Sequence, residues 1–288
     1  MKIDARTGKF QINALVVEGG AMRGIFSTGV LDAFLVKQFN PFDIYIGVSA
    51  GATNIAAYLA GMVQRNYKVY TDYSVRPDFI NWRKFIFGGH LVDIDWLWET
   101  TIREIRLDMA EIYRVDRDFF VGVTEVSTGK AVYLKPDAQN LENVVKASSS
   151  IPVFYRKSVQ IDGVSYTDGG LADPIPVREA YHRNANNIMV LRSRPHTYSM
   201  KQNSNLLSKI YLSKFPKLLE ATHNRAKIYQ ESIGFMRNPP EGVRIKEINP
   251  PESFKTKRLT KDVSILKKDY ETGFQIGLQI VDEWNVDG

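Results

Sequence analysis

Two short motifs in the first sixty residues carry the groups that acyl transfer needs. One motif holds a serine among small residues, Gly47-Val48-Ser49-Ala50-Gly51. The other is a glycine-rich turn, Gly19-Gly20-Ala21-Met22-Arg23-Gly24. A serine hydroxyl can act as a nucleophile, and backbone N–H groups without bulky neighbours can stabilise an oxyanion. Together the two motifs predict an acyl-transfer or hydrolase site.

The setting of Ser49 favours a nucleophile over an ordinary tight turn. An apolar run at 42–46 precedes the motif, and a stretch of small residues from Ala52 follows it. A sharp strand-to-helix turn that presents a serine requires small neighbours, because bulkier side chains would clash with the backbone. The N-terminal dipole of the following helix would also favour negative charge near Ser49. Gly-x-Ser-x-Gly occurs often by chance, so this position in the chain carries the argument.

The glycine-rich turn has several interpretations. A dinucleotide-binding turn also follows a strand and opens a helix, but here Ala21 occupies the third position and no acid ends a second strand. A P-loop needs Lys-Ser/Thr after Gly24, and the chain lacks it. An oxyanion hole would use the N–H groups of Gly20 and Ala21, with Arg23 fixing the loop or attracting a phosphate. The accompanying serine motif favours this last interpretation over a purely structural turn.

Asp168 is the best candidate for the base that accepts the serine proton. It precedes two glycines, which allow a turn that brings the carboxylate close to a partner: Asp168-Gly169-Gly170. An α/β-hydrolase would use a histidine downstream of the serine, and three are present: His182, His196 and His223. In that fold, however, the nucleophile follows several strands, whereas Ser49 follows only the second. The histidines also lie among polar neighbours, which indicates surface positions.

Strand and helix signals alternate through the first two hundred residues, which predicts an α/β fold with a mostly parallel sheet. Strands are expected near 13–18, 42–47, 118–124, 131–135 and 187–192. Helices are expected near 24–38, 50–63, 96–107, 140–149, 176–184 and 262–284. We expect a catalytic core at 1–200 and a C-terminal α-rich extension at 201–288 that packs on it.

In their order and spacing, the glycine turn, the serine motif and the aspartate turn resemble the patatin-like phospholipase family over roughly residues 13–195. Two further stretches match the family: Ala147-Ser148-Ser149-Ser150-Ile151-Pro152 and Asp173-Pro174-Ile175-Pro176-Val177. The resemblance implies a three-layer α/β/α core with a mostly parallel central sheet. It also implies a dyad without histidine, in which Ser49 is the nucleophile, Asp168 is the general base and the glycine turn forms the oxyanion hole.

One position departs from the family pattern. The family usually has a third glycine where this chain has Ala21. An alanine keeps the N–H group and adds one methyl group. If this residue adopts a positive φ, the alanine costs about 1 kcal/mol, which a fold of this size tolerates. The substitution therefore bears on the geometry of the hole and leaves the nucleophile intact.

Composition excludes several other classes of site. The chain of 288 residues has no cysteine, so disulfides and thiolate metal sites are absent, and its net charge is +6. No carboxylate cluster suggests a metal, since Asp93 and Asp95 fit the start of a helix, and no cofactor is expected. The N-terminus has no apolar signal region, and no apolar run is long enough to span a membrane. These features predict a cytoplasmic protein, and the absence of nucleic-acid-binding motifs argues against a nucleic-acid partner.

Two segments raise the question of lipid contact. The stretch 201–227 is basic and amphipathic, so it could rest on the anionic inner membrane surface, although a packed helix with a solvated basic face is favoured. The aromatic stretch from Trp82 to Trp98, together with Phe79, could cap an acyl pocket that Phe154 and Tyr155 also line, although core packing is favoured there. The oligomeric state is not specified by any of these patterns.

The function expected from these features is hydrolysis of fatty-acyl esters through an acyl-enzyme on Ser49, with a lipid or other acyl ester as substrate. Two alternatives remain open. One is a short-chain esterase or thioesterase. The other is a lipid-binding protein that has lost turnover, although Ser49 and Asp168 are both present.

Overall fold

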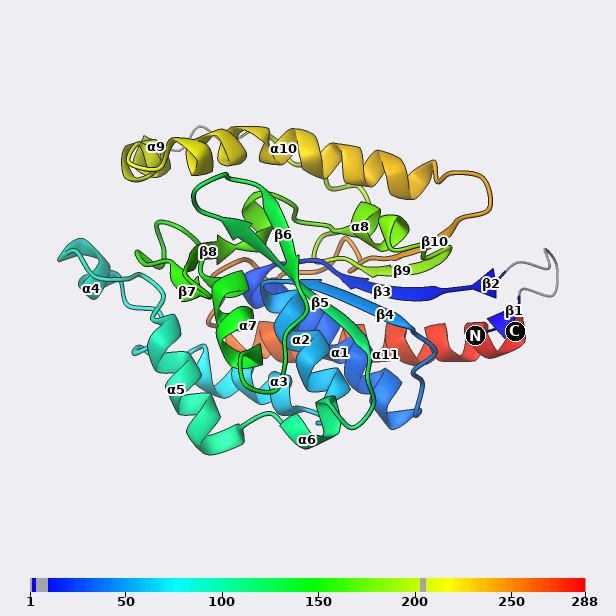
Figure 1. The fold of residues 1–288 in the computed structure, drawn as a ribbon. Coiled ribbons are helices and arrows are strands. Elements are labelled where there is room, and N and C mark those ends of the chain that lie inside the picture. Colours follow the sequence, from blue (N-terminus) through cyan, green and yellow to red (C-terminus); the bar gives the residue numbers. More distant parts are fainter. Residues whose placement is uncertain (1, 4–9, 203–205, 288) are drawn as a thin grey trace.

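The structure is a computed structural model that describes residues 2–3, 10–202 and 206–287. These residues form an eight-stranded sheet in which a path of seven strands runs β10-β9-β3-β4-β5-β8-β7 and β6 pairs with β5 (Figure 1). The strands on that path, in spatial order, are β10 (Arg244–Ile248), β9 (Asn187–Leu191), β3 (Asn13–Val17), β4 (Ile44–Val48), β5 (Asp118–Glu125), β8 (Val164–Asp168) and β7 (Val159–Ile161). The remaining strand of the sheet is β6 (Ala131–Leu134), and β1 (Lys2–Ile3) pairs separately with β2 (Phe10–Gln11).

The five strands from β10 to β5 are parallel, whereas β6 and β8 run antiparallel to β5 and β7 runs antiparallel to β8. β3 and β4 are buried along their whole length, as apolar strands in the middle of a parallel sheet are. The carboxyl ends of β3, β4 and β9 therefore meet at one edge of the sheet. In α/β proteins this edge is where ligands bind.

Helices cover both faces of the sheet, so the molecule has three layers (Figure 1). On the lower face in Figure 1 lie α1 (Ile25–Val36), α2 (Ala50–Leu59), α3 (Arg65–Lys68), α5 (Ile94–Ile105), α6 (Met109–Ile112), α7 (Leu141–Ser149) and α11 (Val263–Asp287). On the upper face lie α8 (Val177–His182), α9 (Leu206–Leu212) and α10 (Pro216–Arg237). Shorter elements are η1 (Ala21–Gly24), η2 (Val69–Tyr73), α4 (Trp82–Ile86) and η3 (Gly169–Leu171).

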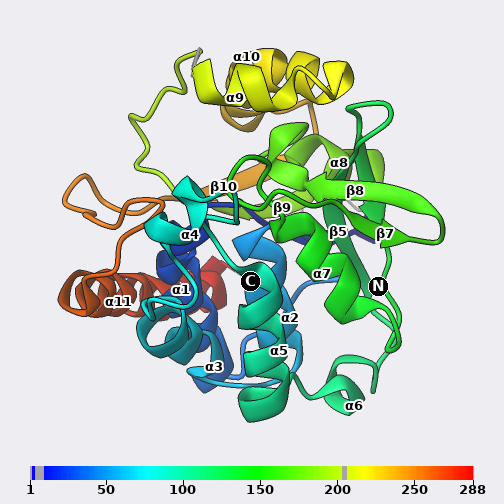
Figure 2. The ribbon, with the colours of Figure 1, turned by 90° about the vertical axis from the view of Figure 1, so that its left-hand side faces the viewer.

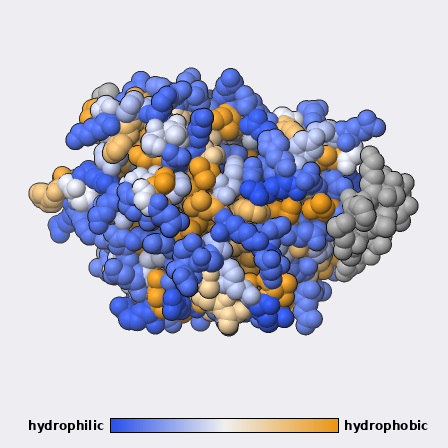
Figure 3. Space-filling model, in the orientation of Figure 1, coloured by the Kyte–Doolittle hydropathy of each residue, from blue (hydrophilic) through white to orange (hydrophobic). Residues whose placement is uncertain are grey.

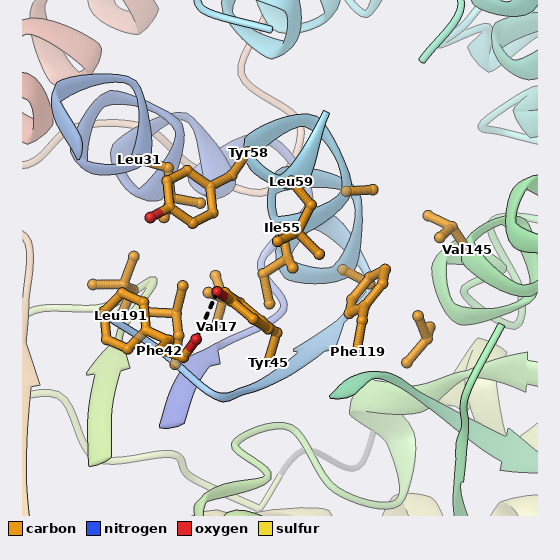
Figure 4. Packing of buried hydrophobic residues seen from close by; sticks show 14 of the residues in the cluster. Val17, Leu31, Phe42, Tyr45, Ile55, Tyr58, Leu59, Phe119, Val145 and Leu191 are labelled. Atoms are coloured by element: carbon orange, nitrogen blue, oxygen red, sulfur yellow. Dashed lines mark hydrogen bonds between the residues drawn. The ribbon is translucent and has the colours of Figure 1, made fainter. Parts of the chain in front are cut away.

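Each face of the sheet has its own hydrophobic core, because alternate side chains of a strand point to opposite faces. Leu15 and Val17 of β3 join the lower core, whereas Ala14 and Val16 join the upper core. Figure 4 shows part of the lower core, where the hydroxyl of Tyr45 donates to the carbonyl of Phe42 at 2.9 Å. The predicted three-layer architecture with a mostly parallel sheet is confirmed.

The C-terminal residues are built into this architecture. β10 extends the sheet by pairing in parallel with β9, and the hydroxyl of Tyr270 in α11 donates to buried Asp32 in α1 at 2.9 Å. The predicted α-rich character of this part is confirmed by α10 and α11, but the sequence analysis did not predict β10. The division of the chain near residue 200 stays a prediction.

All of the strands and helices predicted from the sequence are present, with ends that differ by a few residues. The prediction missed the antiparallel strands β7 and β8, the short helices α3, α4 and α6, and the full length of α10. Of the basic stretch 201–227, residues 203–205 lie outside the described residues. Most of the rest lies in α9 and in the first half of α10, and α10 buries Leu218 and Ala221, so the favoured prediction of a packed helix is confirmed for this part.

Candidate active site

Ser49 lies at the sharp turn between β4 and α2. Its backbone has φ +54° and ψ −126°, a conformation that residues with a side chain adopt rarely and usually at functional positions. At Gly51 a Cβ atom would overlap the carbonyl oxygen of Val17, so only glycine lets α2 begin this close to β3. The small residues around the serine thus allow the turn for the steric reason predicted from the motif.

A buried serine that was not assigned a role from the sequence holds this turn in place. The N–H group of Ser49 donates to Oγ of Ser148 at 2.7 Å, and that hydroxyl donates to the carbonyl of Gly122 at 2.6 Å. Ser148 is completely buried at the end of α7. Its partners lie in β5 and after β4, so only the tertiary structure reveals what it does. The signals in the sequence are a run of three serines, 148–150, at the end of an amphipathic helix, and the resemblance of the stretch 147–152 to the family.

The glycine-rich turn lies directly against Ser49. A Cβ atom at Gly19 would be 3.1 Å from Cβ of Ser49, so a side chain there would crowd the turn. Within the described part of the chain, the N–H groups of Gly20 and Ala21 donate no hydrogen bond, whereas Met22 and Arg23 both donate to carbonyls. Ala21 has φ +49°, a left-handed backbone conformation that is strained for a residue with a Cβ atom. The two amides expected to form an oxyanion hole are unengaged beside the serine.

Asp168 ends β8 and is buried next to Ser49. Its Oδ1 accepts the N–H group of Gly170 at 2.9 Å, while its buried Oδ2 has no regular hydrogen bond among the described residues. Burial raises the pKa of Asp168, and the nearby Ser49 hydroxyl and the charges of Arg225 and Arg258 oppose that shift. A carboxylate with a raised pKa is a stronger base. Because one of its oxygens is free and lies beside the Ser49 hydroxyl, that oxygen can accept the hydroxyl proton.

The histidines do not take part in this arrangement. His182, His196 and His223 are exposed, as the sequence analysis expected. The fourth, His90, accepts the N–H group of Arg156 through Nδ1 at 2.9 Å. None of the four lines the cavity that contains Ser49.

Ser49 opens into an apolar cavity of about 120 Å³, here called the apolar cavity. Its lining includes side chains from the aromatic stretch and the start of α5: Phe79, Ile80, Val92, Ile94, Leu97 and Trp98. These residues also belong to small hydrophobic cores, so the favoured prediction of core packing is confirmed for them. A cap over an acyl pocket stays a prediction. Phe154 lines the cavity as well. Tyr155 does not, because its hydroxyl points to Asp95 at 2.9 Å.

Acidic side chains elsewhere have structural partners. Asp93 caps α5 by accepting the N–H group of Trp96 at 3.1 Å, and Asp95 forms ion pairs with Lys146 at 2.5 Å and Lys157 at 3.2 Å. Among the described residues, no group of three or more histidine, aspartate or glutamate side chains is arranged to hold a metal ion.

A buried arginine cluster anchors the glycine turn from the other side. Arg192 forms an ion pair with Glu18 at 2.9 Å and another with Glu247 of β10, and it donates to Tyr229 of α10 at 2.7 Å. Glu18 also accepts the N–H group of Ser193 at 2.7 Å. Since Glu18 immediately precedes the turn, the C-terminal elements help to position it. In each of these interactions the two residues are more than thirty positions apart in the chain, so no local pattern signals them.

Two arginines near Asp168 lie on a helix and a loop of the C-terminal part of the chain. Arg225 of α10 donates to the carbonyl of Gly170 at 2.5 Å, which secures the aspartate turn. Arg258 accepts the N–H group of Met22 through its carbonyl at 3.4 Å. Both arginines come from the C-terminal third of the chain, and sequence analysis gave neither a role.

Comparison with known proteins gives three findings. Residues 15–181 match the family model described as patatin-like phospholipase, and residues 215–286 match a domain of unknown function, DUF6363. The uncharacterized protein YjjU of Escherichia coli strain K12 is 36% identical over 265 residues, which are 90% of this chain and 74% of that protein. The crystal structure of VipD from Legionella pneumophila aligns with a TM-score of 0.48 at 13% identity, covering 96% of this chain and 67% of that one.

Proposed function

This chain belongs to the patatin-like phospholipase family, and from that premise we propose that it hydrolyses fatty-acyl esters of lipids through a dyad of Ser49 and Asp168. One observation carries the proposal. A buried carboxylate, one oxygen of which has no hydrogen bond within the described structure, lies beside a serine in a strained turn that opens into an apolar cavity. A purely structural turn needs neither the free carboxylate oxygen nor the cavity.

In the first half of the reaction, Oδ2 of Asp168 accepts the Ser49 proton as Oγ bonds to the ester carbonyl carbon. The N–H groups of Gly20 and Ala21 stabilise the negative oxygen that forms. When the intermediate collapses, the ester C–O bond breaks and the leaving alcohol takes the proton from Asp168. The acyl group is then bound to Ser49 as an ester.

In the second half, Asp168 removes a proton from water, and the hydroxide attacks the acyl-enzyme. The carbonyl–Oγ bond breaks, the proton returns to Ser49 and the fatty acid leaves. Burial favours both halves because it raises the pKa of Asp168 toward the working pH, which is where general bases are most effective.

A second candidate function is supported by the size of the apolar cavity. A volume of about 120 Å³ is small for a long acyl chain, and it favours a short-chain esterase or thioesterase unless neighbouring side chains move. Chain length separates the two functions. A lipid hydrolase prefers long chains presented in vesicles or micelles, whereas a short-chain esterase is fastest on butyrate esters.

The test is fluorophosphonate labelling, together with hydrolysis of p-nitrophenyl esters from four to sixteen carbons and of phosphatidylglycerol. We expect Ser49→Ala to abolish labelling and to lower kcat about 10⁴-fold or more. We expect Asp168→Asn to lower kcat about 10²- to 10⁴-fold. Matched controls are Ser127→Ala and Asp116→Asn at exposed positions, which leave the rate within about twofold of the wild-type rate.

If wild-type protein neither labels at Ser49 nor hydrolyses any ester, the hydrolase proposal is wrong and a lipid-binding role replaces it. If Ser49→Ala retains activity, the nucleophile lies elsewhere. If kcat fell by the same factor in Asp168→Asn and in Asp116→Asn, Asp168 would be excluded as the base.

We also infer that the protein makes peripheral contact with anionic membranes through the region of α4. Trp82, Ile86 and Phe87 are 58%, 75% and 89% exposed, an unusual grouping of large apolar side chains. Figure 3 shows hydrophobic atoms projecting at the left edge, where α4 lies in Figure 1. Arg83 is exposed in the same helix, and Lys209 is exposed in α9 on the same side of the molecule, so the charge suits anionic lipid. The part of the chain that the structure describes contains no helix long and apolar enough to cross a bilayer.

Sedimentation with vesicles that contain phosphatidylglycerol measures this contact. We expect Phe87→Ser to lower the fraction of bound protein about 5-fold or more, because an exposed aromatic ring contributes roughly 1–3 kcal/mol when it enters the interface. The matched control is Val36→Ser, which alters another exposed apolar side chain in α1. Equal binding of both variants and the wild-type protein would exclude α4 as the contact.

A further inference from the structure

A second, larger cavity adjoins the site, and its lining is strongly basic. This basic cavity has a volume of about 850 Å³ and lies between the loop at 151–154, α4 and the α9–α10 pair. Figure 2 looks onto this side of the molecule, with α4 near the middle and α9 and α10 above it. In the described part of the chain, six cationic side chains line the cavity: Arg23, Arg194, Lys201, Arg225, Lys257 and Arg258.

The cations reach the cavity from separate parts of the chain. Arg23 comes from η1, Arg194 from the segment after β9, Arg225 from α10 and Arg258 from the segment before α11. Among the described residues that line the cavity, Glu18 is the one acidic residue, and its carboxylate already pairs with Arg192 and accepts the N–H group of Ser193. The cavity therefore has a net positive charge that this carboxylate does not balance.

The four guanidinium groups have few protein partners. Among the described residues, none of the four forms an ion pair with a carboxylate, and the buried Nε of Arg23 has no hydrogen bond. Arg225 is oriented by its hydrogen bond to Gly170, and Arg194 by stacking 4.2 Å above the Tyr198 ring. Burial, together with the charges of Arg194 and Arg258, lowers the pKa of Arg23 to about 9. Two carboxylates partly offset these like charges, Glu18 near Arg23 and Asp168 near Arg225 and Arg258. The cations still outnumber them, so a bound anion would be stabilising.

The basic cavity and the apolar cavity share a wall. Ile151, Phe154, Arg258 and Leu259 line both of them. A molecule whose ester carbonyl lies at Ser49 could therefore place its acyl chain in one cavity and a charged group in the other. Guanidinium groups are matched in geometry to phosphate, which accepts two parallel N–H hydrogen bonds from each.

We propose that the basic cavity is a phosphate-binding subsite that receives the headgroup of an anionic acyl lipid. This inference rests on the proposed hydrolase function and names its substrate class. Phosphatidylglycerol presents a phosphate with no positive charge, whereas the quaternary ammonium of phosphatidylcholine would lie among the arginines and be repelled. The subsite therefore selects net anionic headgroups over zwitterionic and uncharged ones.

The first measurement compares turnover of phosphatidylglycerol, phosphatidylcholine and diacylglycerol with identical chains in neutral detergent micelles, so that surface charge does not dominate. We expect wild-type kcat/KM to be about 10-fold or more higher for phosphatidylglycerol than for either of the others. We expect Arg194→Gln and Arg258→Gln each to reduce this selectivity about 10-fold. The matched control is Lys227→Gln in α10, an exposed cation outside the cavity, which keeps wild-type selectivity.

The second measurement is independent of activity. Inorganic phosphate is titrated into the Ser49→Ala protein by calorimetry, with and without the Arg194→Gln or Arg258→Gln change. Saturable binding that both changes weaken, and that Lys227→Gln does not, supports the subsite even if no ester is hydrolysed. If phosphate binds in this way but no ester is hydrolysed, the hydrolase proposal is wrong and the phosphate subsite still stands.

The outcomes separate the two sources of phosphate. Binding of inorganic phosphate with no lipid selectivity would overturn the headgroup assignment and make the cavity a site for free phosphate. Equal hydrolysis of the three lipids with no phosphate binding would overturn the subsite altogether. Thermal melting of each variant checks folding, and because two arginines are tested separately, one unstable variant leaves the other to decide.

Discussion

The two ends of the chain serve the candidate site in different ways. In the N-terminal sixty residues, the turns after β3 and β4 place their own amides and hydroxyl by local backbone geometry. The C-terminal residues contribute from a distance, since Tyr229 and Glu247 support the glycine turn through Arg192, which lies far from them in the sequence. Reactive groups are thus positioned by short motifs, whereas the charges and hydrogen bonds that hold those motifs come from the tertiary structure.

Breaking the buried arginine cluster should have the largest effect on stability. In Arg192→Met, the buried carboxylate of Glu18 loses its ion-pair partner and keeps the N–H group of Ser193, while Glu247 keeps Arg237 at 3.5 Å. We expect the free energy of unfolding to fall by about 3–5 kcal/mol, measured by urea denaturation. The glycine turn should also lose its anchor, so esterase activity should fall in the protein that remains folded.

An exposed ion pair on the same strand provides the control. Lys246 of β10 pairs with Glu283 at 2.7 Å, and both side chains are exposed. We expect Lys246→Met to change the free energy of unfolding by less than about 1 kcal/mol. If Arg192→Met behaved the same way, the C-terminal elements would not support the turn through this cluster.

The contact between α1 and α11 should give a pH-dependent effect of intermediate size. Burial raises the pKa of Asp32 to about 6 from its ordinary 3.8, while hydrogen bonds from Tyr270 and Gln64 oppose the shift. The folded protein therefore holds a proton that the unfolded chain releases, so this residue's contribution to stability is lost as pH rises from about 4 through about 6. The total change is about 3 kcal/mol at most.

Asp32→Asn removes the titrating group and keeps an oxygen that can accept from Tyr270. We expect its stability relative to wild type to rise as pH increases across that interval and to level off above it, measured by urea denaturation at several pH values. A difference between the two proteins that is constant with pH would contradict the raised pKa.

The smallest effect is expected within the glycine turn itself. Ala21 has φ +49°, which costs about 1–2 kcal/mol, and Ala21→Gly relieves that strain while making the unfolded chain more flexible. We expect a net gain of about 0.5–1 kcal/mol in thermal unfolding. Activity should change by no more than a few-fold, because the N–H group is retained. A loss of stability would mean that the alanine methyl group packs usefully in the apolar cavity, which Ala21 also lines.

Most of the parallel half of the sheet could be predicted from the sequence, because buried parallel strands are continuous apolar runs. β7 and β8 were missed since they are short and only partly apolar, and β10 was missed because its charged residues do not resemble a central strand. β10 is an edge strand in the sheet path, where polar side chains are tolerated.

The sequence by itself determined the family, the two turns and the choice of Ser49 and Asp168 as candidates. These depend on small residues next to a reactive one, and such requirements are local, so short motifs record them. Only the tertiary structure decided that Ser148 holds the serine turn, that Arg192 anchors the glycine turn and that the arginines of the basic cavity converge beside the site. Hydrogen bonds and electrostatic interactions act through space between distant parts of the chain, and spacing along the sequence does not encode that proximity.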